Sequence, residues 1–346
     1  VVALELVSLS ENAVFRVDTE DGGRHALRLH RPGYNSRAEM DSELAWVEAL
    51  RAAGVDTPLI RRDAGGNGFR EVDIELEVEG EGEIGVEREV ERGVRSEVAG
   101  ETPRVGTETR LAGLIEWIDG VDLDHVLAPP AEPGRPTRQP TRQMVAETYR
   151  RIGVTLAVIR RHGQVWEPPP GFTRRRWDAD GLVGPQPLWG RFWEIPADED
   201  RRRLFRRAAE VLHRRLSNLP TDRAAFGLIH ADLHTRNVLV AGDRLVIIDF
   251  DDAGFGWFIH EIAVALHPAT DEPWFGDARE ALIDGYRSMY PLTDIEVELL
   301  PAFLTIRSLM VVAWLDARPE LGLSDHLPAV IDGAAADAER YLDSDP

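Results

Sequence analysis

Residues 227–252, GLIHADLHTRNVLVAGDRLVIIDFDD, hold two acidic islands in an otherwise apolar stretch. The first island carries Asp232, with Asn237 five residues further along the chain. The second island is Asp249-Phe-Asp251. A buried carboxylate is unfavourable unless a partner or a metal compensates its charge. The pattern therefore indicates a chemical site rather than an ordinary apolar core.

The chemistry that fits this pattern is phosphoryl transfer from ATP. That reaction needs a group beside the acceptor hydroxyl and Mg²⁺ ions that bridge phosphate oxygens, and Mg²⁺ prefers hard oxygen ligands. We expect Asp232 to orient and deprotonate the hydroxyl, and Asn237 and Asp249 to hold the metal. The sequence between the islands reads strand–turn–strand, so a hairpin would bring them to one end.

Composition narrows the class of protein. The 346 residues indicate two domains or lobes. The chain has no Cys. It also has no Lys, and the absence of Lys excludes a P-loop that ends in Gly-Lys-Ser/Thr. A net charge of -21 disfavours partners such as nucleic acid and anionic membranes. An apolar run of the ~18 residues that span a membrane is absent, as is a signal-peptide pattern, so we expect a cytoplasmic protein. The acidic balance fits either a salt-rich cytoplasm or coding bias with one acidic insert.

The first part of the chain reads as β-rich. Residues 1–31 read as strands with a hairpin turn at EDGG, and Ser36–Gly54 reads as a capped helix. Two further strands, Arg70–Val78 and Thr109–Ile118, flank a Glu-rich segment at about 79–106. That segment has little apolar content, and we interpret it as an exposed acidic insert.

The second part reads as mainly helical after a Pro/Gly-rich linker at 128–140. The predicted helices are Met144–His162, Asp198–Ser217, His260–Leu266, Asp277–Met289, Ile295–Ala317 and Leu327–Tyr341. We therefore expect an N-lobe, residues 1–118, that binds nucleotide. A C-lobe, residues 119–346, would carry the catalytic loop and the acceptor pocket.

The segment from 227 to 252 resembles the aminoglycoside phosphotransferase / choline kinase family, which carries H-x-D-x-x-x-x-N and then I-D-F/W-x. Four other stretches resemble phosphotransferases near homoserine kinase type II: ALRLHRPGY (26–34), RLAGLIEWIDG (110–120), FTRRRWDADGLVGPQPLWGRFW (172–193) and IDFDDAGFGWF (248–258). The resemblance implies an α+β, bilobal protein-kinase-like fold with a small antiparallel β lobe plus one helix and a larger, mainly helical lobe. It also implies an ATP- and Mg²⁺-dependent kinase for a small-molecule hydroxyl, with an aminoglycoside-, homoserine- or choline-like acceptor.

The resemblance further implies how phosphates are bound. Arg28 stands where the family has a phosphate-binding Lys, and Glu43 is the expected helix partner, with Glu39 one turn earlier as the alternative. Arg is a good phosphate ligand but is not interchangeable with Lys, which puts catalytic strength in question. A polar loop replaces the Gly-rich loop, and Ser10 and Asn12 would cover the phosphates.

The adenine pocket and the loop supports follow from the same resemblance. Strand alternation puts Ala26 on the face of Arg28, where it would line the adenine pocket. The stretch LIEWIDG is similar to the hinge, whose backbone at Glu116 and Ile118 would meet the adenine edge. His230 and Glu261 would support the catalytic loop through hydrogen bonds.

Three other functions stay open. Arg28 and the missing Gly-rich loop suit a nucleotide-binding, pseudokinase-like module. A Ser/Thr protein kinase would use the same catalytic residues, but the sequence offers no basic docking surface. His230, Asp232 and His234 also read as H-x-D-x-H, a set that a metallohydrolase uses. The oligomeric state is left open by the sequence.

Overall fold

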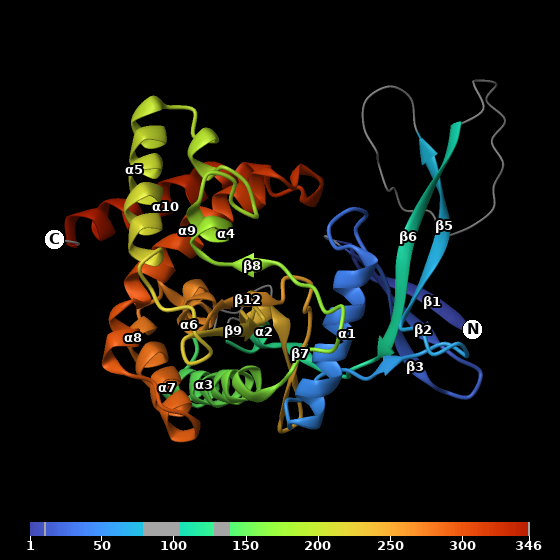
Figure 1. The fold of residues 1–346 in the computed structure, drawn as a ribbon. Helices are drawn as coiled ribbons and strands as arrows, with labels where there is room; N and C mark the ends of the chain where they lie inside the picture. Colours follow the sequence, from blue (N-terminus) through green and yellow to red (C-terminus); the bar gives the residue numbers. More distant parts are fainter. Residues whose placement is uncertain (10–11, 79–103, 128–138, 345–346) are drawn as a thin grey trace. The chain divides into compact units, whose positions relative to one another are not determined.

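The computed structural model describes residues 1–9, 12–78, 104–127 and 139–344 (Figure 1). Ser10 and most of the predicted Glu-rich insert lie outside these residues. The chain divides into two compact units, Val1–Arg37 with Ile60–Trp117, and Ala38–Leu59 with Ile118–Pro346. Helix α1 (Arg37–Ala52) thus groups with the second unit, whereas the expected N-lobe contained it.

The first unit is built on one antiparallel sheet in the order β1-β2-β3-β6-β4, with β5 also paired to β6. Its strands are β1 (Ala3–Leu9), β2 (Ala13–Asp18), β3 (Arg24–Leu29), β4 (Ile60–Arg61), β5 (Phe69–Val78) and β6 (Arg104–Glu116). The predicted hairpin is confirmed, because β2 pairs with β3 along its whole length. Gly22 in its turn has φ 79°, a conformation that glycine adopts without steric cost.

The second unit is mainly helical. Its helices after α1 are α2 (Leu123–Leu127), α3 (Arg142–Val165), α4 (Ala179–Val183), α5 (Glu199–Leu216), α6 (Phe258–Leu266), α7 (Phe275–Met289), α8 (Asp294–Glu298), α9 (Leu300–Asp316) and α10 (Leu327–Ser344). The prediction of one helix over Ile295–Ala317 was wrong, because that stretch holds α8 and α9. Pro301 lacks an amide hydrogen, so it suits the first turn of a helix and ends the one before.

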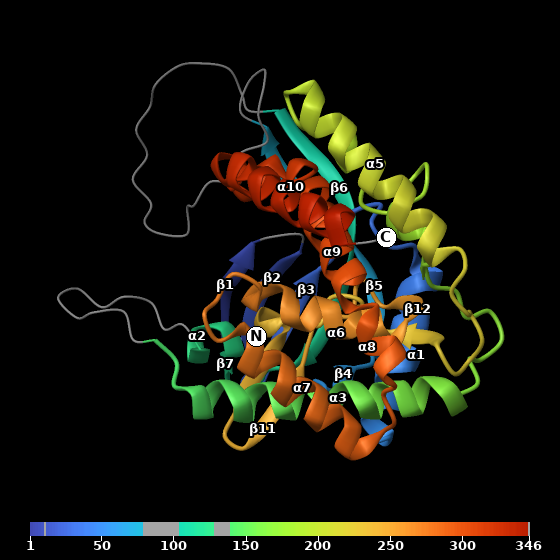
Figure 2. The ribbon, with the colours of Figure 1, turned by 90° about the vertical axis from the view of Figure 1, so that its left-hand side faces the viewer.

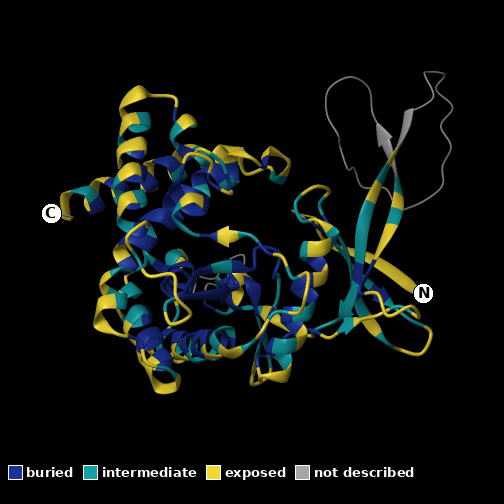
Figure 3. Cartoon of the chain, viewed as in Figure 1, coloured by how far each residue is buried: buried dark blue, intermediate teal, exposed yellow. Residues whose placement is uncertain are grey.

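The core of this unit forms around α6. All nine α6 residues are buried, seven of them apolar and the other two His260 and Glu261 (Figure 3). Helices α3 and α7 lie side by side (Figures 1 and 2). A Cβ on Gly153 would lie 2.0 Å from the Leu282 carbonyl oxygen, and one on Gly285 would lie 2.0 Å from that of Arg150. Only glycine therefore allows this approach. Within the described residues, none of the helices has the length and apolarity to cross a bilayer.

Two small sheets of the second unit position the candidate site. One has the order β11-β10-β7 and the other β8-β12-β9. Their strands are β7 (Val121–Asp122), β8 (Arg176–Trp177), β9 (Phe226–Ile229), β10 (Val238–Ala241), β11 (Arg244–Ile247) and β12 (Gly254–Trp257). The predicted strand–turn–strand between the acidic islands is confirmed as β10 and β11.

Candidate active site

Two loops of the second unit carry the acidic islands. The first loop, residues 230–237, joins β9 to β10, and the second loop, residues 248–253, joins β11 to β12. Strand β9 pairs antiparallel with β12, and β10 with β11, so both loops emerge at the same end of the paired strands. The Ile248 amide donates to the Asn237 carbonyl at 3.0 Å. The expectation that a hairpin brings the islands together is confirmed.

Asp232, the predicted base, is held through both carboxylate oxygens. Oδ1 accepts a hydrogen bond from Arg307 Nη2 at 2.5 Å, and Oδ2 accepts one from Asn237 Nδ2 at 2.9 Å. His234 Nε2 lies 3.4 Å from Oδ2. Burial alone would raise the pKa of Asp232, but the charges of His234 and Arg307 hold it well below its usual value. The carboxylate is therefore ionised at neutral pH.

Asn237 and Asp249 are the predicted metal ligands. Asn237 also donates Nδ2 to the Asp232 carbonyl at 2.9 Å, which leaves Oδ1 as its ligand atom. Asp249 has φ 65°, a left-handed conformation that is rare outside glycine and is concentrated at functional sites. An amide oxygen and a carboxylate are donors of the hard type that suits Mg²⁺. The donor set fits the metal, and the ligand roles remain a prediction.

His230 connects the two loops. Its ring is fully buried and its Nε2 donates to the Ile248 carbonyl at 3.0 Å, while Nδ1 accepts from the Asp232 amide at 3.3 Å. Burial lowers the pKa of His230 to about 4, so the ring is neutral. The predicted supporting role is confirmed. Both ring nitrogens take part in hydrogen bonds. To bind a metal ion, as a metallohydrolase site would require, His230 would have to break one of these bonds.

Glu261 on α6 supports the first loop from beneath. Its Oε1 accepts a hydrogen bond from the His230 amide, as predicted. Ala231, the next residue, has φ 65°, and its amide also lowers the pKa of this carboxylate. Burial raises the pKa of Glu261 to about 8 against the effect of the two amides. The strained turn before Asp232 is thus fixed by a buried acidic group.

Arg174 fixes the second loop, which the sequence did not indicate. All five N–H groups of its guanidinium are used, as this planar donor set allows. Three bonds go to the second loop: Nη2 donates to the carbonyls of Phe250 (3.1 Å) and Asp251 (2.6 Å), and Nε to that of Ala253 (2.5 Å). Nη1 reaches α1, at the Glu39 carbonyl (3.1 Å) and Glu43 Oε2 (3.5 Å).

The residues after Arg174 extend this contact. Arg175 forms an ion pair with Asp252 at 2.8 Å, and the Trp177 indole donates to the Asp252 carbonyl at 2.8 Å. Trp177 is fully buried and Trp189 nearly so. The Trp- and Arg-rich stretch at 172–193 thus contributes Trp177 to the core and two arginines to the second loop.

The predicted phosphate-binding residues lie in different parts of the chain. Arg28 belongs to β3 in the first unit and pairs with Gly113 of β6. Asn12 is buried and accepts from the Arg31 amide at 3.0 Å, which ties it to the end of β3. Glu43 lies in the second unit with Arg174 as a partner. Its expected pairing with Arg28 joins the two units and remains a prediction.

The predicted adenine-binding residues adjoin one another along the chain and the sheet. Ala26 is buried and pairs with Ile115, next to Glu116, the last residue of β6. Ile118 follows two residues later, where the second unit resumes. This register puts the expected hinge beside the strand that carries Ala26.

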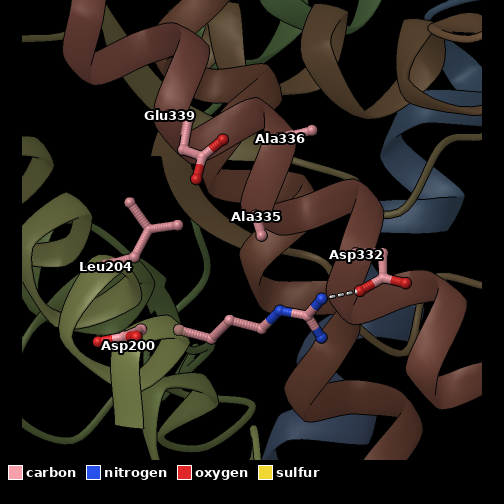
Figure 4. Close-up of a pocket in the computed structure, with 7 residues that line it drawn as sticks. Asp200, Leu204, Asp332, Ala335, Ala336 and Glu339 are labelled. Carbon is pink, nitrogen blue, oxygen red and sulfur yellow. Dashed lines mark ion pairs between the residues drawn. The ribbon is translucent and has the colours of Figure 1, made fainter. Parts of the chain in front are cut away.

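A groove of about 330 Å³ lies elsewhere in the second unit, between α5 and α10 (Figure 4). An ion pair between Arg201 and Asp332 crosses it. Its lining residues are Asp200, Arg201, Leu204, Asp332, Ala335, Ala336 and Glu339. None of the predicted site residues is among them, so the groove adds nothing to the proposed chemistry.

The buried His260 should make folding sensitive to acid. It lies on α6 between Trp177 and Phe303, and within the described chain neither ring nitrogen has a hydrogen-bond partner. Burial lowers its pKa to about 3, whereas an unfolded His titrates near ~6.5. Stability from this group is complete above that pH and is lost as the pH falls toward 3, because only the unfolded chain binds the proton.

Replacing His260 should remove this dependence. The free energy of unfolding, measured by urea titration, should fall between pH 7 and pH 5 in both proteins. We expect this fall to be about 2 kcal/mol smaller in His260→Phe than in the parent. The same substitution at exposed His326 is the control. Equal losses in the parent and His260→Phe would contradict the assignment of a neutral, buried ring.

A model of the phosphotransferase enzyme family matches residues 3–294. Amicoumacin kinase of Bacillus subtilis (strain 168) is 28% identical over 151 residues, 41% of this chain and 42% of the relative. Homoserine kinase of Rhizobium meliloti (strain 1021) is 34% identical over 164 residues, 46% of this chain and 48% of the relative. The chain thus spans less than half the length of these curated relatives.

The fold extends along almost the whole chain of a solved relative. The structure of a microcompartment-associated aminopropanol kinase matches with a TM-score of 0.73 and 28% identity, over 99% of this chain and 93% of that chain. The predicted kinase-like α+β fold, an antiparallel sheet followed by a helical part, is therefore confirmed.

Proposed function

We propose, on the premise that this chain belongs to the phosphotransferase enzyme family, that it transfers the γ-phosphate of ATP to the hydroxyl of a small molecule. The observation that carries the proposal is the meeting of Asp232, Asn237 and Asp249 on two paired loops. These residues supply a base and two oxygen ligands, which are the groups that phosphoryl transfer needs.

Asp232 acts on the acceptor. The acceptor oxygen forms a bond to the γ-phosphorus, and its proton moves to the Asp232 carboxylate. The bond from that phosphorus to the bridging oxygen breaks, and its electron pair leaves with ADP. His230 and Glu261 keep the first loop in place for this transfer through the bonds described above.

The metal site is formed by Asn237 Oδ1 and the Asp249 carboxylate. Mg²⁺, when bound, neutralises charge on the phosphate oxygens. The hydrogen bonds from Asn237 Nδ2 to Asp232 orient the amide so that one residue serves both the base and the metal. Arg174 sets the position of Asp249 by fixing the carbonyl of the next residue, Phe250.

The remaining predicted residues bind the nucleotide in this proposal. Arg28 contacts phosphate oxygens, with Ser10 and Asn12 covering them. Ala26 and the backbone of Glu116 and Ile118 surround adenine. The acceptor is a small molecule with a hydroxyl, a proposal supported by relatives whose names refer to amicoumacin, homoserine and aminopropanol.

Calorimetry of ATP binding tests the nucleotide and metal sites. We expect ATP to bind the parent more tightly with Mg²⁺ than without it. Asp249→Asn should weaken the Mg²⁺-dependent binding by about tenfold or more, because it removes an anionic ligand. The buffer should be of high ionic strength, since a net charge of -21 causes self-repulsion that salt screens.

Asp243→Asn is the matched control, because it makes the same change in charge at the exposed turn between β10 and β11. It should bind ATP like the parent. A folded parent that binds no ATP with or without Mg²⁺ would refute the proposed function. Binding without any phosphorylated acceptor would instead favour the pseudokinase-like module.

A further inference from the structure

Arg307 on α9 holds the predicted base, but the proposed reaction gives it no contact with a substrate. Its side chain is 8% exposed and donates from Nη2 to Asp232 Oδ1 at 2.5 Å. The guanidinium carbon lies 4.8 Å from the ring centre of Trp189. Within the described residues, Nη1 is buried and has no hydrogen-bond partner. One edge of a buried cation is therefore unsatisfied beside the reacting group.

This arrangement is unfavourable for a kinase in two respects. A buried charged donor without an acceptor is costly, and a carboxylate held by guanidinium is a weak base. The nearby rings of His260 and His267 do not offset the positive charge of Arg307. Burial keeps both rings neutral, and the charge of Arg307 lowers the pKa of each further. An anion supplied by the acceptor would remove both defects.

We propose that Arg307 recognises a carboxylate on the acceptor, so that the substrate class is hydroxy amino acids or hydroxy acids rather than simple amino alcohols. This inference rests on the proposed function. The carboxylate would accept from Nη1 and compete with Asp232 for Nη2, since guanidinium binds carboxylates through two parallel bonds. Asp232 Oδ1 then becomes available for the acceptor hydroxyl. A cationic amino alcohol brings no such group and is repelled by the guanidinium.

Matched pairs of acceptors isolate the carboxylate. Homoserine and 3-aminopropan-1-ol differ only by this group, as do threonine and 1-aminopropan-2-ol, and serine and ethanolamine. ADP release and phosphorylated product should be measured for every compound with the parent enzyme. We expect kcat/KM to be at least about tenfold higher for the carboxylate member of the pair that the enzyme accepts.

Variants at Arg307 test whether this residue makes the distinction. Arg307→Gln should lower kcat/KM for the carboxylate member by about 10²-fold and for its partner by much less, so that the preference disappears. Arg307→Lys keeps the charge and should fold, but it loses the two-bond geometry and most of the preference. The control is Arg318→Gln, because Arg318 is also buried and stacked on a Trp, Trp314. It should keep the preference of the parent.

The outcomes separate this inference from the proposed function. Phosphorylation of amino alcohols with equal or better efficiency would overturn the inference and leave the kinase intact. Equal losses for both members in Arg307→Gln would mean that Arg307 only positions Asp232, which also overturns it. ATP binding without phosphorylation of any carboxylate-bearing acceptor refutes the inference, and absence of ATP binding refutes the proposed function as well.

Discussion

Asp232→Asn is expected to lower turnover by about 10²–10⁴ while ATP still binds, as loss of a general base does. Asn has nearly the same shape as Asp but accepts no proton from the acceptor hydroxyl. One of its two side-chain positions also becomes an NH₂ group, which faces a donor from Arg307 or Asn237. ATP affinity should be retained because the proposed metal ligands are unchanged.

Two measurements on the same preparations check this result. Turnover is followed as ADP release with the best acceptor, and ATP binding with Mg²⁺ is measured by calorimetry. Asp243→Asn at the far end of the hairpin controls for the altered charge. Turnover near that of the parent would refute the role of Asp232, whereas loss of both activity and ATP binding would indicate a damaged loop rather than a missing base.

The features that were predictable from sequence share a local origin. Two short apolar runs around an Ala-Gly-Asp turn predicted β10 and β11, and this pairing alone places Asn237 opposite Ile248, next to Asp249. The supporting hydrogen bonds of His230 and Glu261 followed from the family resemblance. The prediction failed at Pro301, which lies in the first turn of α9 and separates it from the short acidic helix α8 within a stretch predicted as one helix.

The features that were missed depend on distant parts of the chain. Arg307 lies 75 residues from Asp232 in sequence, and Arg174 lies 76 to 79 residues from the carbonyls it binds in the second loop. Local patterns do not encode such partners. A signal existed for Arg307, because a single charge within the apolar run of α9 demands a compensating group. That reasoning indicates that a partner exists but not which residue it is.

Arg174→Leu is expected to lower the free energy of unfolding by about 3–5 kcal/mol, the range for breaking a buried ion pair by removing one partner. The substitution leaves Glu43 as a buried carboxylate without this cation and deprives four carbonyls of a donor. Urea unfolding followed by tryptophan fluorescence measures the loss. Arg176→Leu is the control, since its side chain is 55% exposed in the same run of arginines.

Arg174→Lys separates stability from the position of the metal ligand. Lys has three donors where Arg has five, so the variant should fold while the second loop loses fixed contacts. We expect the Mg²⁺ concentration for half-maximal ATP binding to rise by about tenfold, with little change in ATP binding without metal. Arg176→Lys should behave like the parent. An unchanged Mg²⁺ requirement in folded Arg174→Lys would contradict the positioning of Asp249.

A double-mutant cycle with Glu43→Gln decides whether α1 and the second loop are coupled through Arg174. If the 3.5 Å contact is an effective ion pair, removing both partners should cost less than the sum of the single changes, by about 0.5–3 kcal/mol. Additive effects would mean that Arg174 acts on the loop carbonyls alone. Coupling would instead make the position of α1, and thus of Glu43, depend on the loop that carries Asp249. The proposed phosphate and metal sites would then be held by one buried cation.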